Sequence, residues 1–68
     1  MVLTNDLKVW RARRDITQEE LGLAVKLSRQ TIHSIERGKF VPSVISALKL
    51  AQHFETTIEK IFFYEEGE

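Results

Sequence analysis

The polar side chains between residues 29 and 37 have the types and spacing suited to contact with DNA bases. A helix turns by about 100° per residue, so Ile32 and Ile35 face one side of a helix over this stretch. The opposite side carries Gln30, His33, Ser34 and Arg37, with Arg29 and Thr31 on its flanks. Glutamine pairs with adenine and arginine with guanine, while serine and threonine adapt to either. None of these positions is acidic, which favours a DNA contact over an ordinary solvated surface.

Charge along the chain is compatible with a polyanionic partner on one part of the surface. The ten basic and ten acidic residues are unevenly placed, with a net charge of +4 over residues 1–54 and −4 over residues 55–68. A basic body with an acidic end presents a positive face to nucleic acid. The balanced total charge gives no such indication, so a solvated surface stays the alternative on charge alone.

Other kinds of chemistry have little support in the sequence. The chain has no cysteine, which excludes disulfides, thiolate metal sites and cysteine nucleophiles. The two histidines, His33 and His53, are too few and too scattered to form a metal site. The sequence has no serine–histidine–aspartate pattern, glycine-rich phosphate loop or carboxylate pair. We therefore expect no catalysis, no metal, no cofactor and no small-molecule ligand.

The length limits the chain to a single domain over residues 1–68. A chain of 68 residues, 43% of them hydrophobic, buries only a small core. No run approaches the roughly 20 apolar residues of a membrane span, and residues 1–8 lack the basic and apolar segments of a signal peptide. We expect a cytoplasmic domain with no membrane contact.

Capping signals divide the chain into five short helices. Thr17 and Glu20 have the spacing of a capping box, and Gly38 suits the left-handed residue that follows a helix end. The residues expected to cap the five helices are Thr4 or Asn5, Thr17, Ser28, Ser43 and Thr57. The first helix is expected to end near residue 14, the second near 25 and the third near 37.

Apolar spacing assigns an inner face to each helix and a strand to each end. The fourth helix is expected to bury Val44, Leu48, Ala51 and Phe54. Trp10 is expected in the core. Phe40 is expected to pack under the loop before the fourth helix, with exposure beside DNA as the alternative. The β-favouring runs at residues 1–3 and 62–64 predict a two-stranded antiparallel ribbon, with frayed ends as the alternative.

Residues 18–37 have the pattern of a DNA-binding helix-turn-helix motif. Only Lys26 and Leu27 join the second helix to the third, so the two must cross steeply at a small residue, which Gly22 supplies. Apolar residues occupy positions 21, 25, 27, 32 and 35, and the other positions are mostly polar.

The stretch TQEELGLAVKLSRQTIHSIERGKFVPS resembles the Cro and phage-repressor type of helix-turn-helix domain, also called the xenobiotic-response-element family. The resemblance extends over about residues 7–61 and is greatest to short stand-alone members of the cytolysin-repressor type. It implies an all-α, compact five-helix, lambda-repressor-like domain with a ribbon formed by the two ends. One departure is Lys26, which stands where the family usually has glycine.

The resemblance also implies roles for individual residues. Those matched to base-reading positions are Arg29, Gln30, Thr31 and Ser34. Those matched to phosphate contacts are Gln18, Ser28, Arg37 and Lys39. Arg11 and Glu36 match a buried ion pair that joins the first helix to the end of the third. The alternative for Arg11 is a side chain that buries its stem and keeps its charge in water.

These features together favour a sequence-specific transcriptional regulator that binds double-stranded DNA, and specifically a repressor. No second domain is evident in the sequence, so control through concentration or a protein partner is expected. The alternative is a protein-interaction module on the same fold, such as an antitoxin or an adaptor. The basic and amide-bearing recognition face favours DNA.

Surplus apolar residues near the end of the sequence predict a homodimer. The residues assigned to the interface are Ile58, Ile61, Phe62, Phe63 and Tyr64. A small core is not expected to cover all five, and an exposed apolar patch marks a partner site. A two-fold dimer presents two recognition helices to major grooves about 34 Å apart on a near-palindromic operator. The alternative is a monomer whose aromatic residues fold back onto the helices.

Overall fold

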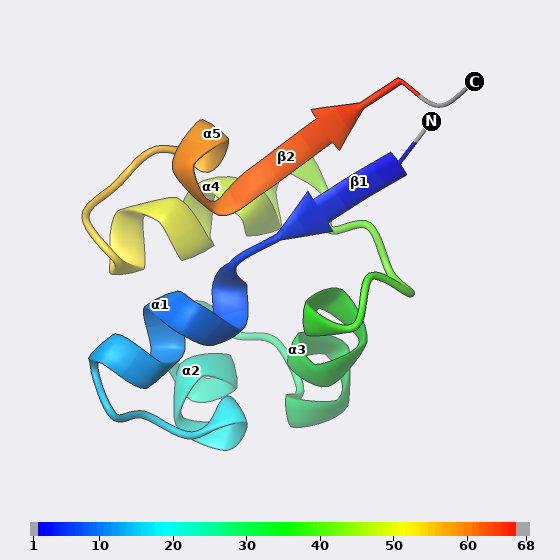
Figure 1. Cartoon of the computed structure of the whole chain (residues 1–68). Helices are drawn as coiled ribbons and strands as arrows, with labels where there is room; N and C mark the ends of the chain where they lie inside the picture. The colour runs from blue at the N-terminus through cyan, green and yellow to red at the C-terminus, as the bar shows by residue number, and fades with distance from the viewer. Residues whose placement is uncertain (1, 67–68) are drawn as a thin grey trace.

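The computed structural model describes residues 2–66 of the chain. Within this range the order of elements is β1 (Val2–Asn5), α1 (Leu7–Arg13), α2 (Gln18–Val25), α3 (Arg29–Glu36), α4 (Val44–His53), α5 (Ile58–Ile61) and β2 (Phe62–Glu65). Figure 1 shows the ribbon at one end of the molecule and α2 at the other. The five helices and the antiparallel ribbon confirm the predicted fold class. Met1, which was expected in the ribbon, lies outside the described residues.

Local hydrogen bonds explain why three helices begin where the sequence predicts. The Thr17 hydroxyl accepts from the Glu20 amide at 3.0 Å, and the Glu20 carboxylate accepts from the Thr17 amide at 2.8 Å, which completes the capping box. Ser28 accepts from the amide of Thr31, and Ser43 caps α4 in the same way. These bonds satisfy amide groups that have no partner within the helix.

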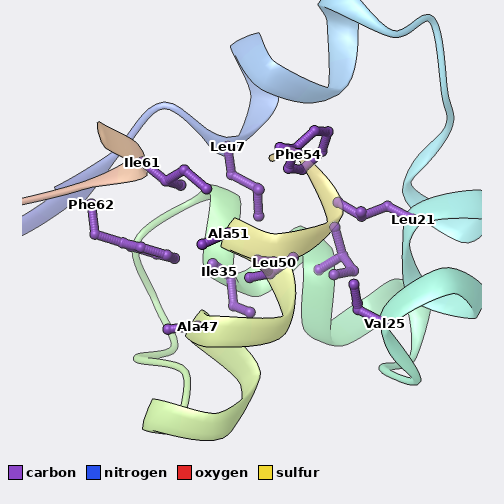
Figure 2. Packing of buried hydrophobic residues seen from close by; sticks show 11 residues of the cluster. Leu7, Leu21, Val25, Ile35, Ala47, Leu50, Ala51, Phe54, Ile61 and Phe62 are labelled. Atoms are coloured by element: carbon purple, nitrogen blue, oxygen red, sulfur yellow. The ribbon is translucent and has the colours of Figure 1, made fainter. Parts of the chain in front are cut away.

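One apolar cluster joins all five helices and the start of β2 (Figure 2). Its buried members are Leu7, Leu21, Val25, Ile32, Ile35, Ala47, Leu50, Ala51, Phe54, Ile61 and Phe62. Trp10 packs at the edge of this cluster, with its ring centroid 6.1 Å from that of Phe54. Its indole nitrogen donates to the Lys60 carbonyl at 3.3 Å, so the one polar atom of the ring is satisfied.

The expected inner face of α4 is wrong in part. Ala51 and Phe54 are buried, but Val44 is 74% exposed and Leu48 is 46% exposed. Ala47 and Leu50 point inward in their place. Because α4 has apolar residues on two sides, its spacing alone does not decide which side packs on the core. The expectation for Phe40 is also wrong, because its side chain is half exposed.

The turn between α2 and α3 brings two backbones into contact. The Leu27 amide donates to the Gly22 carbonyl at 2.8 Å, and a Cβ atom at Gly22 would collide with the Leu27 carbonyl oxygen. Lys26 ends α2 in the left-handed conformation, with φ of 62°. A residue with a side chain costs about 1–2 kcal/mol in that conformation. The tight turn therefore forms in spite of the lysine, and it needs the glycine at position 22.

Replacing Gly22 with valine is expected to lower the free energy of unfolding by about 1–3 kcal/mol or more, since the new side chain forces α2 away from the turn. Chemical denaturation measures this loss. Ala24 is exposed on the same helix, so Ala24→Val tests the effect of a β-branched residue on helix propensity alone. Equal effects of the two substitutions would show that the close approach at Gly22 is not limiting.

Candidate nucleic-acid interface

The outward side of α3 is a row of polar and basic side chains. Ile32 and Ile35 are buried beneath it. The exposed residues on this side are Arg29, Gln30, His33 and Arg37, and Thr31 and Ser34 are partly exposed. Lys39 follows in the loop after α3 and is also exposed. The structure thus places the residues expected to read bases on one accessible surface, as the helical spacing predicts.

The one acidic residue on α3, Glu36, forms an ion pair with Arg11 of α1. Glu36 accepts from Arg11 at two points, with 2.8 Å from Nε to Oε2 and 3.3 Å from Nη2 to Oε1. The Arg11 side chain is only 17% exposed and that of Glu36 only 5%, and Arg11 also donates to the Ile16 carbonyl. The hydrogen bond to Glu36 raises the pKa of Arg11 above its ordinary value, although burial opposes this. The guanidinium therefore stays charged, and Glu36 brings no uncompensated negative charge to the surface.

Gln18 connects the start of α2 to α3. Its Nε2 atom lies 3.1 Å from Oε1 of Glu36 and 3.2 Å from Nδ1 of His33. Gln18 is partly buried, whereas His33 is exposed. The sequence analysis missed these contacts because spacing along one helix carries no information about partners on another helix.

Two hydroxyl groups at the start of α3 share a hydrogen bond. The oxygen atoms of Ser28 and Thr31 lie 2.8 Å apart, and Ser28 already accepts from the Thr31 amide. Two hydroxyls have two hydrogen atoms, and only one of these is used between them. The other stays available to an acceptor outside the protein.

Asn5 connects the ribbon to α3 through a hydrogen bond. Its Nδ2 donates to the Ile35 carbonyl of α3 at 2.8 Å, and its Oδ1 accepts from the Leu7 amide at 3.0 Å. One side chain at the end of β1 thereby holds both α1 and α3. The Asp6 amide adds a backbone bond to the Ile61 carbonyl at 2.9 Å.

An apolar surface lies on α4 and the loop before it. We call it the α4 surface, and its exposed members are Phe40, Val41, Val44, Ile45 and Leu48. Beside it a cleft of about 330 Å³ separates the loop from the ribbon, with Val41 on one wall and Leu3 and Tyr64 on the other. A second hollow continues this apolar lining from Val41 to Val44.

The structure changes which residues are free for a dimer interface. Ile61 and Phe62 were assigned to it, but both are buried in the core, where they close the space between α4 and the ribbon. Ile58 is partly buried against the same core, and Phe63 and Tyr64 are exposed. Of the nine large hydrophobic residues that are exposed in the described part of the chain, five are therefore on the α4 surface.

Within residues 2–66, every helix is too short or too polar to span a lipid bilayer.

The family model described as helix-turn-helix matches residues 7–61. A helix-turn-helix-type transcriptional regulator of Methanocaldococcus jannaschii is 47% identical over 66 residues, which cover 97% of this chain and all of that protein. A second such regulator, from Bacillus subtilis, is 42% identical over 94% of this chain and 97% of its own length.

Among solved structures, the restriction-modification controller protein C.AhdI from Aeromonas hydrophila is similar to this chain. The two share 28% sequence identity, and the match covers 79% of this chain and 82% of that one with a TM-score of 0.74. The chain therefore belongs to the Cro type of helix-turn-helix transcriptional regulators, a family of DNA-binding proteins rather than enzymes.

Proposed function

We propose that this regulator is a repressor that recognises a near-palindromic operator as a homodimer, with α3 in the major groove. The observation that carries the proposal is the outward side of α3, which presents basic, amide and hydroxyl groups while its single acid is paired with Arg11. Repression needs no further surface, because a dimer bound across a promoter blocks access to it.

We assign the contacts according to the chemistry of each group. The base-reading residues are Arg29, Gln30, Thr31 and Ser34, since their side chains match acceptors, donors and methyl groups in the major groove. The phosphate contacts are Ser28, Arg37, Lys39 and the backbone amide of Gln18. The amide groups in the first turn of α2 have no helical partners, and a helix N-terminus favours an anion.

The dimer contact uses the α4 surface together with Tyr64, which lines the same cleft as Phe40 and Val41. Phe63, the preceding residue of β2, is also exposed. A contiguous apolar patch of this kind marks a partner site, and a second copy is the occupant that DNA recognition requires. One helix-turn-helix makes few base contacts, whereas a two-fold pair places two α3 helices about 34 Å apart on successive turns of DNA. The α4 surface shares no residue with the outward side of α3, so pairing there leaves the proposed base-reading residues open.

Truncation of a base-reading residue is expected to act differently from truncation of a phosphate contact. Arg29→Ala or Gln30→Ala should cost about 1–3 kcal/mol of operator binding and relax the preference at one base pair. Lys39→Ala should weaken binding to all duplexes and lower the slope of log affinity against log salt by about one. Lys60→Ala removes the same charge on α5 and should leave that slope unchanged.

Selection of bound sites from random duplex DNA, followed by a salt titration, tests the proposal as a whole. We expect a selected site with two related halves and binding that weakens steeply with salt. Failure to prefer any sequence at moderate salt would reject operator binding. An adaptor or antitoxin function on the same fold would then be the better account.

A further inference from the structure

We propose that His33 is an additional DNA contact, held by Gln18 in the tautomer that donates a hydrogen bond from Nε2 to an acceptor on DNA. This inference rests on the proposed binding of DNA through α3, and it adds a residue that the family resemblance does not assign. It follows from a chain of hydrogen bonds that runs from the buried ion pair to the surface of α3.

The first step is the orientation of the Gln18 amide. Arg11 fixes the Glu36 carboxylate, whose Oε1 atom lies 3.1 Å from Nε2 of Gln18. An ionised carboxylate only accepts hydrogen bonds, so the nitrogen of the amide must face it. The opposite orientation would place the amide oxygen against a carboxylate oxygen.

The second step is the protonation of the His33 ring. The same Nε2 atom of Gln18 lies 3.2 Å from Nδ1 of His33. An amide nitrogen only donates, so Nδ1 must accept and carries no proton. A neutral imidazole has one N–H group, which is therefore at Nε2. One hydrogen of the Gln18 amide is used on Glu36 and the other on His33.

The third step is the hydrogen-bond donor that the His33 ring presents to DNA. His33 is exposed on the outward side of α3, next to Gln30 and Arg37 along the helix. Because Nδ1 is turned toward Gln18, the Nε2–H group on the other side of the ring points away from it. A fixed donor at this place fits an acceptor on DNA, either a base atom such as N7 or O6 of guanine or a phosphate oxygen. Gln18 is then a positioning residue for His33, in addition to its backbone contact.

Three substitutions at His33 separate the two ring nitrogens. His33→Gln places an amide nitrogen near the position of Nε2 and keeps a donor toward DNA. His33→Asn is shorter, so its amide reaches Gln18 but not the DNA, and His33→Ala removes both contacts. We expect the asparagine and alanine variants to bind the selected operator about tenfold more weakly, the worth of one hydrogen bond. The glutamine variant should bind within about twofold of the unsubstituted protein.

Comparing the loss of affinity for the operator with the loss for random duplex DNA identifies the acceptor. A loss confined to the selected operator, with relaxed preference at one base pair, assigns a base atom. An equal loss on operator and random duplex assigns a phosphate, and either result supports the contact. His53→Ala removes the other histidine, at the end of α4, and should leave binding unchanged. Thermal unfolding of each variant checks that it is folded.

Nitrogen NMR of the His33 ring gives a readout that needs no DNA. At a pH where imidazole is neutral, we expect the proton on Nε2, and Gln18→Ala should allow the other tautomer to appear. A proton on Nδ1 in the unsubstituted protein would overturn the inference, as would an alanine variant that binds the operator normally. If the unsubstituted protein prefers no sequence, the proposed function and the DNA contact both fail, whereas the tautomer result stands.

Discussion

Replacing Glu36 with glutamine is expected to lower the free energy of unfolding by up to about 3–5 kcal/mol, because it leaves the partly buried Arg11 guanidinium without a counter-charge. The Arg11 side chain is 17% exposed, and its position is fixed by bonds to Glu36 and to the Ile16 carbonyl. A small domain has a total stability of about 5–15 kcal/mol, so a loss of this size removes a large part of it. Chemical denaturation followed by circular dichroism measures the loss.

A matched control is available in the second ion pair. Arg14 and Glu55 lie 3.4 Å apart, but Glu55 is 84% exposed. Glu55→Gln is the same chemical change in water, and exposed pairs contribute little to stability. The two denaturation curves should therefore differ clearly. A Glu36→Gln protein as stable as the Glu55→Gln protein would show that Arg11 reaches water when its partner is lost.

Placing a glutamate at Ile45 is expected to dissociate the dimer and to weaken operator binding by about 100-fold or more. Ile45 is 66% exposed within the α4 surface, so the change is tolerated in the monomer but buries a charge in the interface. Losing the second copy removes the gain from linked half-sites, which is about 10²–10⁴ in affinity. Sedimentation equilibrium should show the mass fall to that of one chain, 7.9 kDa.

Leu23 provides the control for this experiment. It is 76% exposed on α2, outside the α4 surface, so Leu23→Glu adds the same charge without touching the proposed interface. That variant should sediment as the unsubstituted protein does. If the unsubstituted protein is itself a single species of 7.9 kDa at micromolar concentration and protects only one half-site, the dimer is excluded.

Local signals made the starts of three helices predictable, whereas the N-cap of α1 is Asp6 rather than Thr4 or Asn5, and Thr57 makes no side-chain cap hydrogen bond. The capping box at Thr17 and Glu20 and the caps at Ser28 and Ser43 depend on residues no more than three positions apart, so the sequence contains all the information they need. The small residue at Gly22 is predictable for the same reason, since the short link between α2 and α3 demands a close approach. The outward side of α3 follows from helical geometry alone.

Tertiary packing decides which side of α4 faces the core, which the local sequence signals do not specify. The sequence of α4 permits an inner face with Val44 and Leu48 or one with Ala47 and Leu50, and only docking against α2 and α5 selects the second. The same ambiguity misplaced the apolar surface. Residues near the end of the chain looked surplus, yet Ile61 and Phe62 are buried in the core, and five exposed apolar residues lie on α4 and the loop before it.

The hydrogen bonds that organise the candidate site could not be predicted from the sequence either. Gln18 and His33 are 15 positions apart, and Asn5 and Ile35 are 30 positions apart. Contacts of this kind depend on how helices cross, which spacing within one helix does not specify. The family resemblance named Arg11 and Glu36 as a pair, but it gave no reason to connect them through Gln18 to the surface.

The ribbon sets the time during synthesis at which a newly made chain can acquire its final form. Its register pairs Val2 with Glu65 and Asn5 with Phe62, and it is the most distant pairing along the chain within residues 2–66. Contacts of such high sequence separation form late in folding, after the local helices. Because Asn5 also holds α3, the recognition helix is not fully anchored until residues 62–65 have left the ribosome.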